Sequence, residues 1–201
     1  MTTPTSTIPV SSQLEPPWVL PNRGTVGMVC LIVAEAAIFV IFFIAYIFYI
    51  GKSLTGPLPG QVLEWPILGT ICLLSSSLTV HYAVSALRRD KLRNCTLGLA
   101  ATVLLGAIFL LTTGLEWYHL IRDDGLTIRT NLFGTTFYSL VGLHATHVII
   151  GLIMLTIALV IALRGRITES HAERLDVLSL YWHFVDAIWI FVFLVVYVLG
   201  R

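Results

Sequence analysis

Five long stretches of this chain are apolar and nearly free of charged residues. Counted between the charged residues that flank them, the stretches hold 22 to 34 residues each, and Glu35 and Asp186 are the two charged residues inside them. About 20 apolar residues are enough for a helix to cross the hydrocarbon core of a bilayer. The pattern predicts an all-α, polytopic bundle of five transmembrane helices, at about residues 24–50, 66–87, 95–120, 132–163 and 174–199.

The segment before the first helix differs in composition from the rest. Residues 1–23 are rich in Thr, Ser and Pro, which predicts an extended tail without a packed core. The segment lacks the basic start, short apolar core and A-x-A exit of a cleaved signal peptide, so we expect the first helix to be an uncleaved anchor. We expect residues 24–201 to form one transmembrane domain.

The basic residues in the connecting segments predict an orientation in the membrane. Lys and Arg are enriched in cytoplasmic loops. If the N-terminus is cytoplasmic, eight basic residues lie on that side and four on the other. The eight are Arg23, Arg88, Arg89, Lys91, Arg93, Arg164, Arg166 and Arg174, and the four are Lys52, Arg122, Arg129 and Arg201. We therefore predict a cytoplasmic N-terminus and a periplasmic C-terminus, with Arg164 and Arg166 near anionic lipid headgroups.

The composition argues against several other classes of protein. Hydrophobic residues make up 57% of the chain and charged residues 11%, whereas soluble domains are about 45–50% apolar and about 25% charged. The net charge of +1 leaves no basic surplus for binding a nucleic acid. The cysteines Cys30, Cys72 and Cys95 lack the C-x-x-C spacing of metal and redox sites.

Three acids in or near the spans are candidates for function, because an ionised side chain at the centre of a membrane helix is unfavourable by at least about 2.5–3.5 kcal/mol. Glu35 lies deep in the first helix, where burial favours the neutral acid unless a cation is near. It is either a proton-handling or partner-facing group, or a neutral acid hydrogen-bonded between helices. Glu116 lies towards the end of the third helix beside Trp117 and Tyr118, which fits either a solvated helix end or a buried role. Asp186, in the last predicted span, is the third of these acids.

Histidines accompany the acids in the last two spans. His183 precedes Asp186 by three residues, so the two share a helix face and a contact between them would fix helix packing. His144 and His147 are also three residues apart, a spacing compatible with two ligands of one metal. A di-iron bundle would add carboxylates in Glu-x-x-His arrangements, and none accompanies this pair. Hydrogen bonds between helices are the favoured interpretation of the pair.

Four segments, in order, resemble the signatures of subunit III of haem-copper terminal oxidases. They are GMVCLIVAEAAIF around Glu35, GLEWYHL around Glu116, GLHATHVIIGLI around His144 and His147, and YWHFVDAIWIFVFLVVYVLG at the C-terminus. The resemblance covers about residues 24 to 200, and YWHFVDAIW is its most specific part. Many members have seven helices, the first two forming one arm of a lipid cleft. Five-helix members exist as well, and this chain corresponds to the longer form from its third helix onward.

The resemblance implies a subunit that itself holds no haem, copper or other metal. In that family, subunit I carries the haems and copper. Subunit III packs beside it, binds phospholipid and supports sustained proton uptake. The family's intramembrane acids then fall on Glu35 and Glu116. Its His and Asp positions fall on His144, His147, His183 and Asp186.

We therefore expect a non-catalytic subunit III of an aa3-type, proton-pumping cytochrome c oxidase, a multi-pass protein of a bacterial inner membrane. Its expected partners are subunits I and II, further respiratory subunits and phospholipid, with no nucleic acid. Subunit III of a quinol oxidase and an accessory protein of nitric oxide reductase are alternatives of the same class. An autonomous intramembrane metalloprotein using the histidines and Glu35 is an alternative of another class. A transporter is disfavoured, because the helices lack matching Gly/Pro interruptions in two halves.

Overall fold

The computed structural model describes residues 22–53, 56–63, 65–168 and 171–200. Residues 1–21 of the predicted tail lie outside this set. The long helices are α1 (Arg23–Tyr49), α3 (Ile67–Leu87), α4 (Leu92–Arg122), α5 (Leu132–Leu163) and α6 (Ala172–Phe193), and α2 (Pro59–Val62) is a single short turn. A π-helix, η2 (Leu194–Leu199), continues α6. The described residues contain no strand and five helices that are long and apolar enough to cross a membrane, which confirms the predicted fold class.

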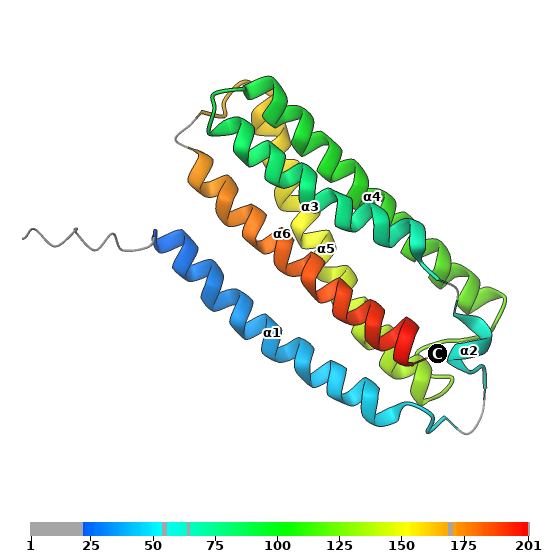
Figure 1. Ribbon diagram of the computed structural model, residues 1–201. Helices are drawn as coiled ribbons and strands as arrows, with labels where there is room; N and C mark the ends of the chain where they lie inside the picture. The colour runs from blue at the N-terminus through cyan, green and yellow to red at the C-terminus, as the bar shows by residue number, and fades with distance from the viewer. Residues whose placement is uncertain (1–21, 54–55, 64, 169–170, 201) are drawn as a thin grey trace, which may run out of the picture.

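Four of the long helices form a closed ring, and α1 packs outside it. Each of α3, α4, α5 and α6 contacts the next, and α6 returns to α3, while α1 packs on α5 and α6. The start of α1 and the turn between α3 and α4 lie at one end of the bundle, and α2 and the C-terminal end lie at the other (Figure 1). Only Phe39 and Tyr46 of α1 are buried. Most of the α1 surface is therefore left for lipid or for another protein.

The basic segment after α3 forms a tight turn between antiparallel neighbours. Asp90 has a left-handed φ of 53°, a conformation that Asp tolerates better than most residues. The backbone N–H of Lys91 returns to the carbonyl of Ala86 at 3.0 Å, and Cys95 N–H bonds the carbonyl of Lys91 at 3.0 Å. The helix α4 thus begins at Leu92, earlier than the apolar stretch, because charged residues mark the edge of the lipid and not the end of the helix.

Small residues set the closest helix contacts. A Cβ added to Gly98 of α4 would lie 2.9 Å from Cβ of Ala83 in α3, so the two backbones approach as small residues in membrane helices allow. A Cβ at Gly106 or at Gly151 would lie 3.0 Å or 2.7 Å from the ring of Trp182. Trp182 is fully buried. The indole ring of Trp182 therefore packs between Gly106 of α4 and Gly151 of α5. This contact sets how closely α6 packs against α4 and α5.

Candidate functional site

A carboxyl group and an imidazole meet between α1 and α5. Oε2 of Glu35 lies 3.2 Å from Nε2 of His147. The other ring nitrogen of His147, Nδ1, lies 2.8 Å from the carbonyl oxygen of Leu143. A carbonyl only accepts hydrogen bonds, so Nδ1 carries a hydrogen. The bond between Nε2 and Oε2 then needs one further proton, which resides either on Glu35 or on His147.

This Glu35–His147 pair lies at mid-depth and at the edge of the bundle. Glu35 is twelve residues after the start of α1, about 18 Å along the helix axis at 1.5 Å per residue. The side chain of Glu35 is 27% exposed and that of His147 is 9% exposed. The ring of Phe39 packs 5.0 Å from the imidazole, and Tyr181 donates to the carbonyl of His147 at 3.3 Å. The pair can hold a proton close to the lipid or protein that contacts α1.

A second polar cluster joins α3 to α6. Ser77 Oγ lies 2.9 Å from Nδ1 of His183 and donates a hydrogen bond to Oδ2 of Asp186. Asp186 is buried, and its Oδ1 has no hydrogen-bond partner among the described residues. The sequence predicts a direct contact between His183 and Asp186. The structure instead bridges them through Ser77, because the neighbouring helix places its hydroxyl between the two side chains.

Two tryptophans of α6 also bond α3. Trp182 Nε1 donates to Ser76 Oγ at 2.8 Å, and Trp189 Nε1 donates to Thr70 Oγ1 at 3.2 Å. With Ser77, these hydroxyls form a ladder of side-chain bonds along the α3–α6 interface. The pattern of the sequence does not predict a role for any of these three hydroxyls. The signal available in the sequence is the run Ser75–Ser77 inside an otherwise apolar span.

His144 lies in an aromatic environment and not in a hydrogen-bonded one. Its ring centroid lies 5.0 Å from that of Trp189 and 5.8 Å from that of Phe109. The ring is fully buried, and neither nitrogen has a hydrogen-bond partner among the described residues. His144 and His147 therefore point to different neighbours, one into the ring of four helices and the other towards α1. Of the pair, only His147 makes the hydrogen bond that the sequence favours.

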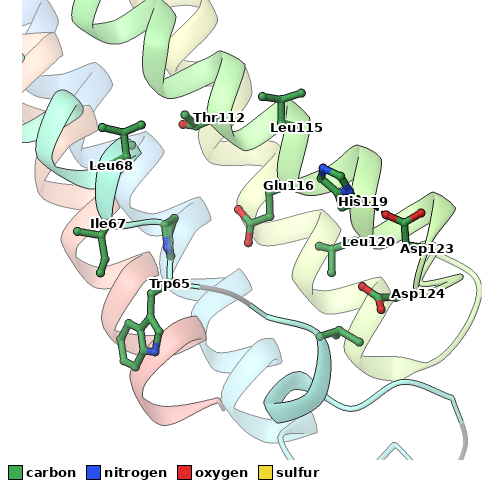
Figure 2. Close-up of a pocket in the computed structure, with 13 residues that line it drawn as sticks. Trp65, Ile67, Leu68, Thr112, Leu115, Glu116, His119, Leu120, Asp123 and Asp124 are labelled. Atoms are coloured by element: carbon green, nitrogen blue, oxygen red, sulfur yellow. Dashed lines mark hydrogen bonds and ion pairs between the residues drawn. The ribbon is translucent and has the colours of Figure 1, made fainter.

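Glu116 lies in an open pocket between the end of α4 and the start of α3. The pocket has a volume of about 490 Å³, and its wall combines apolar side chains such as Trp65 and Leu68 with the carboxyl groups of Glu116 and Asp123. Figure 2 shows the Glu116 side chain directed from α4 towards the start of α3. The hydroxyl of Tyr197 donates to Oε1 of Glu116 at 2.9 Å. Of the two roles left open by the sequence, the half-buried position and this bond favour the buried one.

The basic residues predicted to meet lipid lie at one end of the bundle. Arg164 and Arg166 are exposed and follow the end of α5. Arg88, after α3, pairs with Asp176 of α6. Within the described ranges, no three His, Cys, Asp or Glu side chains are grouped so that they could hold a metal ion.

Comparison with known proteins identifies the family. Residues 21–201 match the family model described as cytochrome c oxidase subunit III. The chain is 34% identical over 168 residues to cytochrome c oxidase subunit 3 of Alkalihalophilus pseudofirmus, an alignment that covers 83% of this chain and 82% of the relative. It is 37% identical over 171 residues to the protein of the same name from Bacillus sp. (strain PS3), covering 83% and 81%. The chain belongs to the cytochrome c oxidase subunit III family. A fungal relative, cytochrome c oxidase subunit 3 of Mycosarcoma maydis, is 34% identical over 190 residues, covering 89% of this chain and 67% of the relative.

Membership in the subunit III family confirms the resemblance carried by the four motifs. It makes the chain a membrane-spanning component of a respiratory oxidase, with an oxidase complex as its partner. Within this subunit III fold, the motif residues Glu35 and His147 come together between α1 and α5, whereas His183 and Asp186 meet through α3. The motifs thus lie at separate helix interfaces and not in one common site.

Proposed function

We propose that this chain is the non-redox accessory subunit III of a proton-pumping, aa3-type cytochrome c oxidase in a bacterial inner membrane. In this role it packs beside subunit I, which carries the haem and copper, and contacts subunit II and further respiratory subunits. It stabilises the catalytic subunit and sustains its proton uptake. The observation that carries the proposal is the contact of 3.2 Å between Oε2 of Glu35 and Nε2 of His147, at mid-depth and at the edge of a subunit III fold.

The chemistry of the pair supports a role in proton uptake. With one bridging proton, the carboxyl group and the imidazole are together neutral, either as a neutral acid and a neutral imidazole or as an ion pair. Release of that proton leaves one net negative charge, which lipid disfavours, so the pair favours rapid uptake of a proton after each release. Glu116, with the hydroxyl of Tyr197, is proposed as a second polar group, near the end of the bundle where α4 ends and α3 begins. The clusters at His144 and at His183–Asp186 are proposed to fix helix packing.

Lipid binding is the second part of the proposed role. Arg164 and Arg166 are exposed at a helix end, where each attracts an anionic headgroup by about 1 kcal/mol. The pocket at Glu116 has apolar walls and carboxyl groups, which suits an amphiphile with an amine-bearing headgroup. We propose that both ends of the subunit hold phospholipid.

Purification of the complex from native membranes in a mild detergent tests the proposal. We expect haem- and copper-containing subunits to co-purify and reduced cytochrome c to drive O2 uptake. A complex that oxidises quinol and not cytochrome c would contradict the proposed electron donor. A haem absorption band or a stoichiometric metal on the isolated chain would contradict the non-redox role.

Variants at Glu35 test the proton-handling part. We expect Glu35→Ala to leave the haem content of the complex intact, while activity decays faster during continuous turnover. Glu35→Gln is the matched control for packing, because an amide can still donate a hydrogen bond to Nε2 of His147 but cannot supply its proton. We expect the glutamine variant to decay as the alanine variant does. Unchanged turnover lifetimes in both variants would refute a role for Glu35 in proton uptake.

A further inference from the structure

One face of the bundle, formed by α3 and α6, carries polar side chains at mid-depth. Leu74, Leu78 and His81 follow one another at helical spacing along the exposed side of α3. On α6, the partly exposed His183 and the exposed Ala187 and Ile190 form a second stripe. The bond between Ser77 and His183 joins the two stripes. We call this surface the α3–α6 face; it is made of Leu74, Ser77, Leu78, His81, His183, Ala187 and Ile190. In Figure 1, α6 lies between α3 and α1, with α5 behind it.

The hydrogen-bond network of this face determines which nitrogen of His183 carries a hydrogen. An ionised Asp186 can only accept, so the one hydrogen of the Ser77 hydroxyl is donated to Asp186. The oxygen of Ser77 therefore accepts from Nδ1 of His183, which lies 2.9 Å away. In a neutral imidazole the other nitrogen, Nε2, then has a free lone pair and acts as an acceptor. No described residue donates a hydrogen bond to Nε2 of His183.

Lipid cannot supply the missing donor. Ser77, which contacts His183, is ten residues from either end of α3, about 15 Å along the helix axis, and half of a bilayer core is about 15 Å. Acyl chains at that depth offer no hydrogen-bond donor, so polar groups there are satisfied within proteins or by enclosed water. The ring is only partly covered by its own chain, and Ala187, four residues further along α6, is exposed.

Among the described residues, the exposed sides of α4 and α5 have no such unsatisfied polar group at this depth. On α4 and α5 the most exposed side chains at comparable depth are apolar, among them Leu104 and Ile157. The exposed hydroxyls of α5, Thr146 and Thr156, donate to carbonyls of their own helix at 2.9 and 2.7 Å. These helices can face lipid without leaving a polar group unsatisfied.

We propose that a membrane-spanning helix of a neighbouring oxidase subunit packs against the α3–α6 face and donates a hydrogen bond to Nε2 of His183. This inference rests on the proposed function, since it takes the chain to be one subunit of an oxidase complex. The short side chain of Ala187, one turn after His183, lets the backbone of a partner helix approach closely. The partner helix carries a hydroxyl, amide or indole donor at mid-depth.

Site-specific photo-crosslinking in the complete complex tests the inference. A benzophenone amino acid is placed at Leu78 or Ala187 on the α3–α6 face, and at Leu104 or Ile157 on the opposite side as controls. We expect the first two positions to form a crosslink to another subunit and the control positions to form none above background. Mass spectrometry of the crosslinked peptide then shows whether the partner segment is a membrane-spanning helix with a donor.

A pair of bulky substitutions provides an independent measurement. Leu78→Trp and Leu104→Trp are matched, because both leucines are exposed, at 74% and 62%, and point away from the rest of their own chain. We expect Leu78→Trp to lower the fraction of subunit III retained in the purified complex and Leu104→Trp to leave it unchanged.

The outcomes separate this inference from the proposed function. A complete complex that crosslinks only through Leu104 or Ile157, or that retains both tryptophan variants equally, would overturn the inference and leave the proposed function intact. If no oxidase subunit co-purifies with the chain, the proposed function is wrong and the inference falls with it.

Discussion

Replacing Ser77 with alanine tests the α3–α6 interface, because one oxygen of this residue holds two side chains of α6. The substitution removes the contact of 2.9 Å with Nδ1 of His183 and the hydrogen bond to Oδ2 of Asp186. Side-chain hydrogen bonds between membrane helices average about 0.6 kcal/mol each, so the two contribute about 1.2 kcal/mol. The loss also leaves the buried Asp186 with neither oxygen bonded, and an unsatisfied buried group costs about 1–3 kcal/mol. We expect Ser77→Ala to lower the free energy of unfolding by about 1–3 kcal/mol.

The assay is unfolding of the purified protein in mixed detergent micelles by increasing the fraction of dodecyl sulfate, followed by far-ultraviolet circular dichroism. Ser75→Ala is the matched control, since Ser75 is in the same helix, is also partly buried, and bonds no other described side chain. We expect the control to change stability by less than about 0.5 kcal/mol. Equal effects of the two substitutions would refute the conclusion that Ser77 connects His183 and Asp186. In the complete oxidase, we expect Asp186→Leu to lower the amount of assembled complex. We expect the turnover rate of the complexes that do assemble to stay unchanged.

Two further predictions concern packing and the Glu35–His147 pair. Gly151→Ala places a Cβ 2.7 Å from the ring of Trp182, so we expect a loss of about 1–3 kcal/mol by overpacking in the same unfolding assay. Gly114→Ala has no atom within 4 Å of its added Cβ and should be neutral or stabilising by up to about 1 kcal/mol; equal losses at both glycines would show that the wedge of Trp182 has no role. Glu35→Ala leaves Nε2 of His147 unsatisfied and should cost about 1–3 kcal/mol, whereas Glu35→Gln should cost less than Glu35→Ala. A glutamine variant as unstable as the alanine variant would argue that the proton, and not the hydrogen bond, stabilises the pair.

The five spans could be predicted because each one is a local property of the sequence. A helix that crosses lipid must satisfy its backbone within itself and present apolar side chains, so length and lack of charge are sufficient to find it. The predicted and observed bounds differ most at the start of α4, where Leu92, Arg93 and Asn94 extend the helix beyond its apolar part. Charge marks where the lipid ends, and a helix continues past that point wherever its backbone hydrogen bonds continue.

The polar residues could be singled out from the sequence but could not be paired. Glu35 and His147 are separated by 112 positions, and Ser77 and Asp186 by 109. Spacing along one helix identifies only neighbours on that helix, which is why the sequence predicts a direct contact of His183 with Asp186 and overlooks the bridging serine. Serine is common in membrane helices as a small packing residue, so its presence in α3 does not reveal its role.

The all-helical class, the five membrane-capable spans and the family can be predicted from the amino-acid sequence, because hydrophobic length and ordered motifs are local features of the chain. The packing of the helices shows which helix lies beside which and that α1 packs outside a ring of four. It also shows that His144 contacts aromatic rings while His147 contacts a carboxyl group. The physical reason is that every span is apolar on nearly all sides, so no face is marked in advance as the inside. Close approach at glycines such as Gly151 and a few hydrogen bonds between helices select the arrangement, and these depend on side chains from different helices meeting in space.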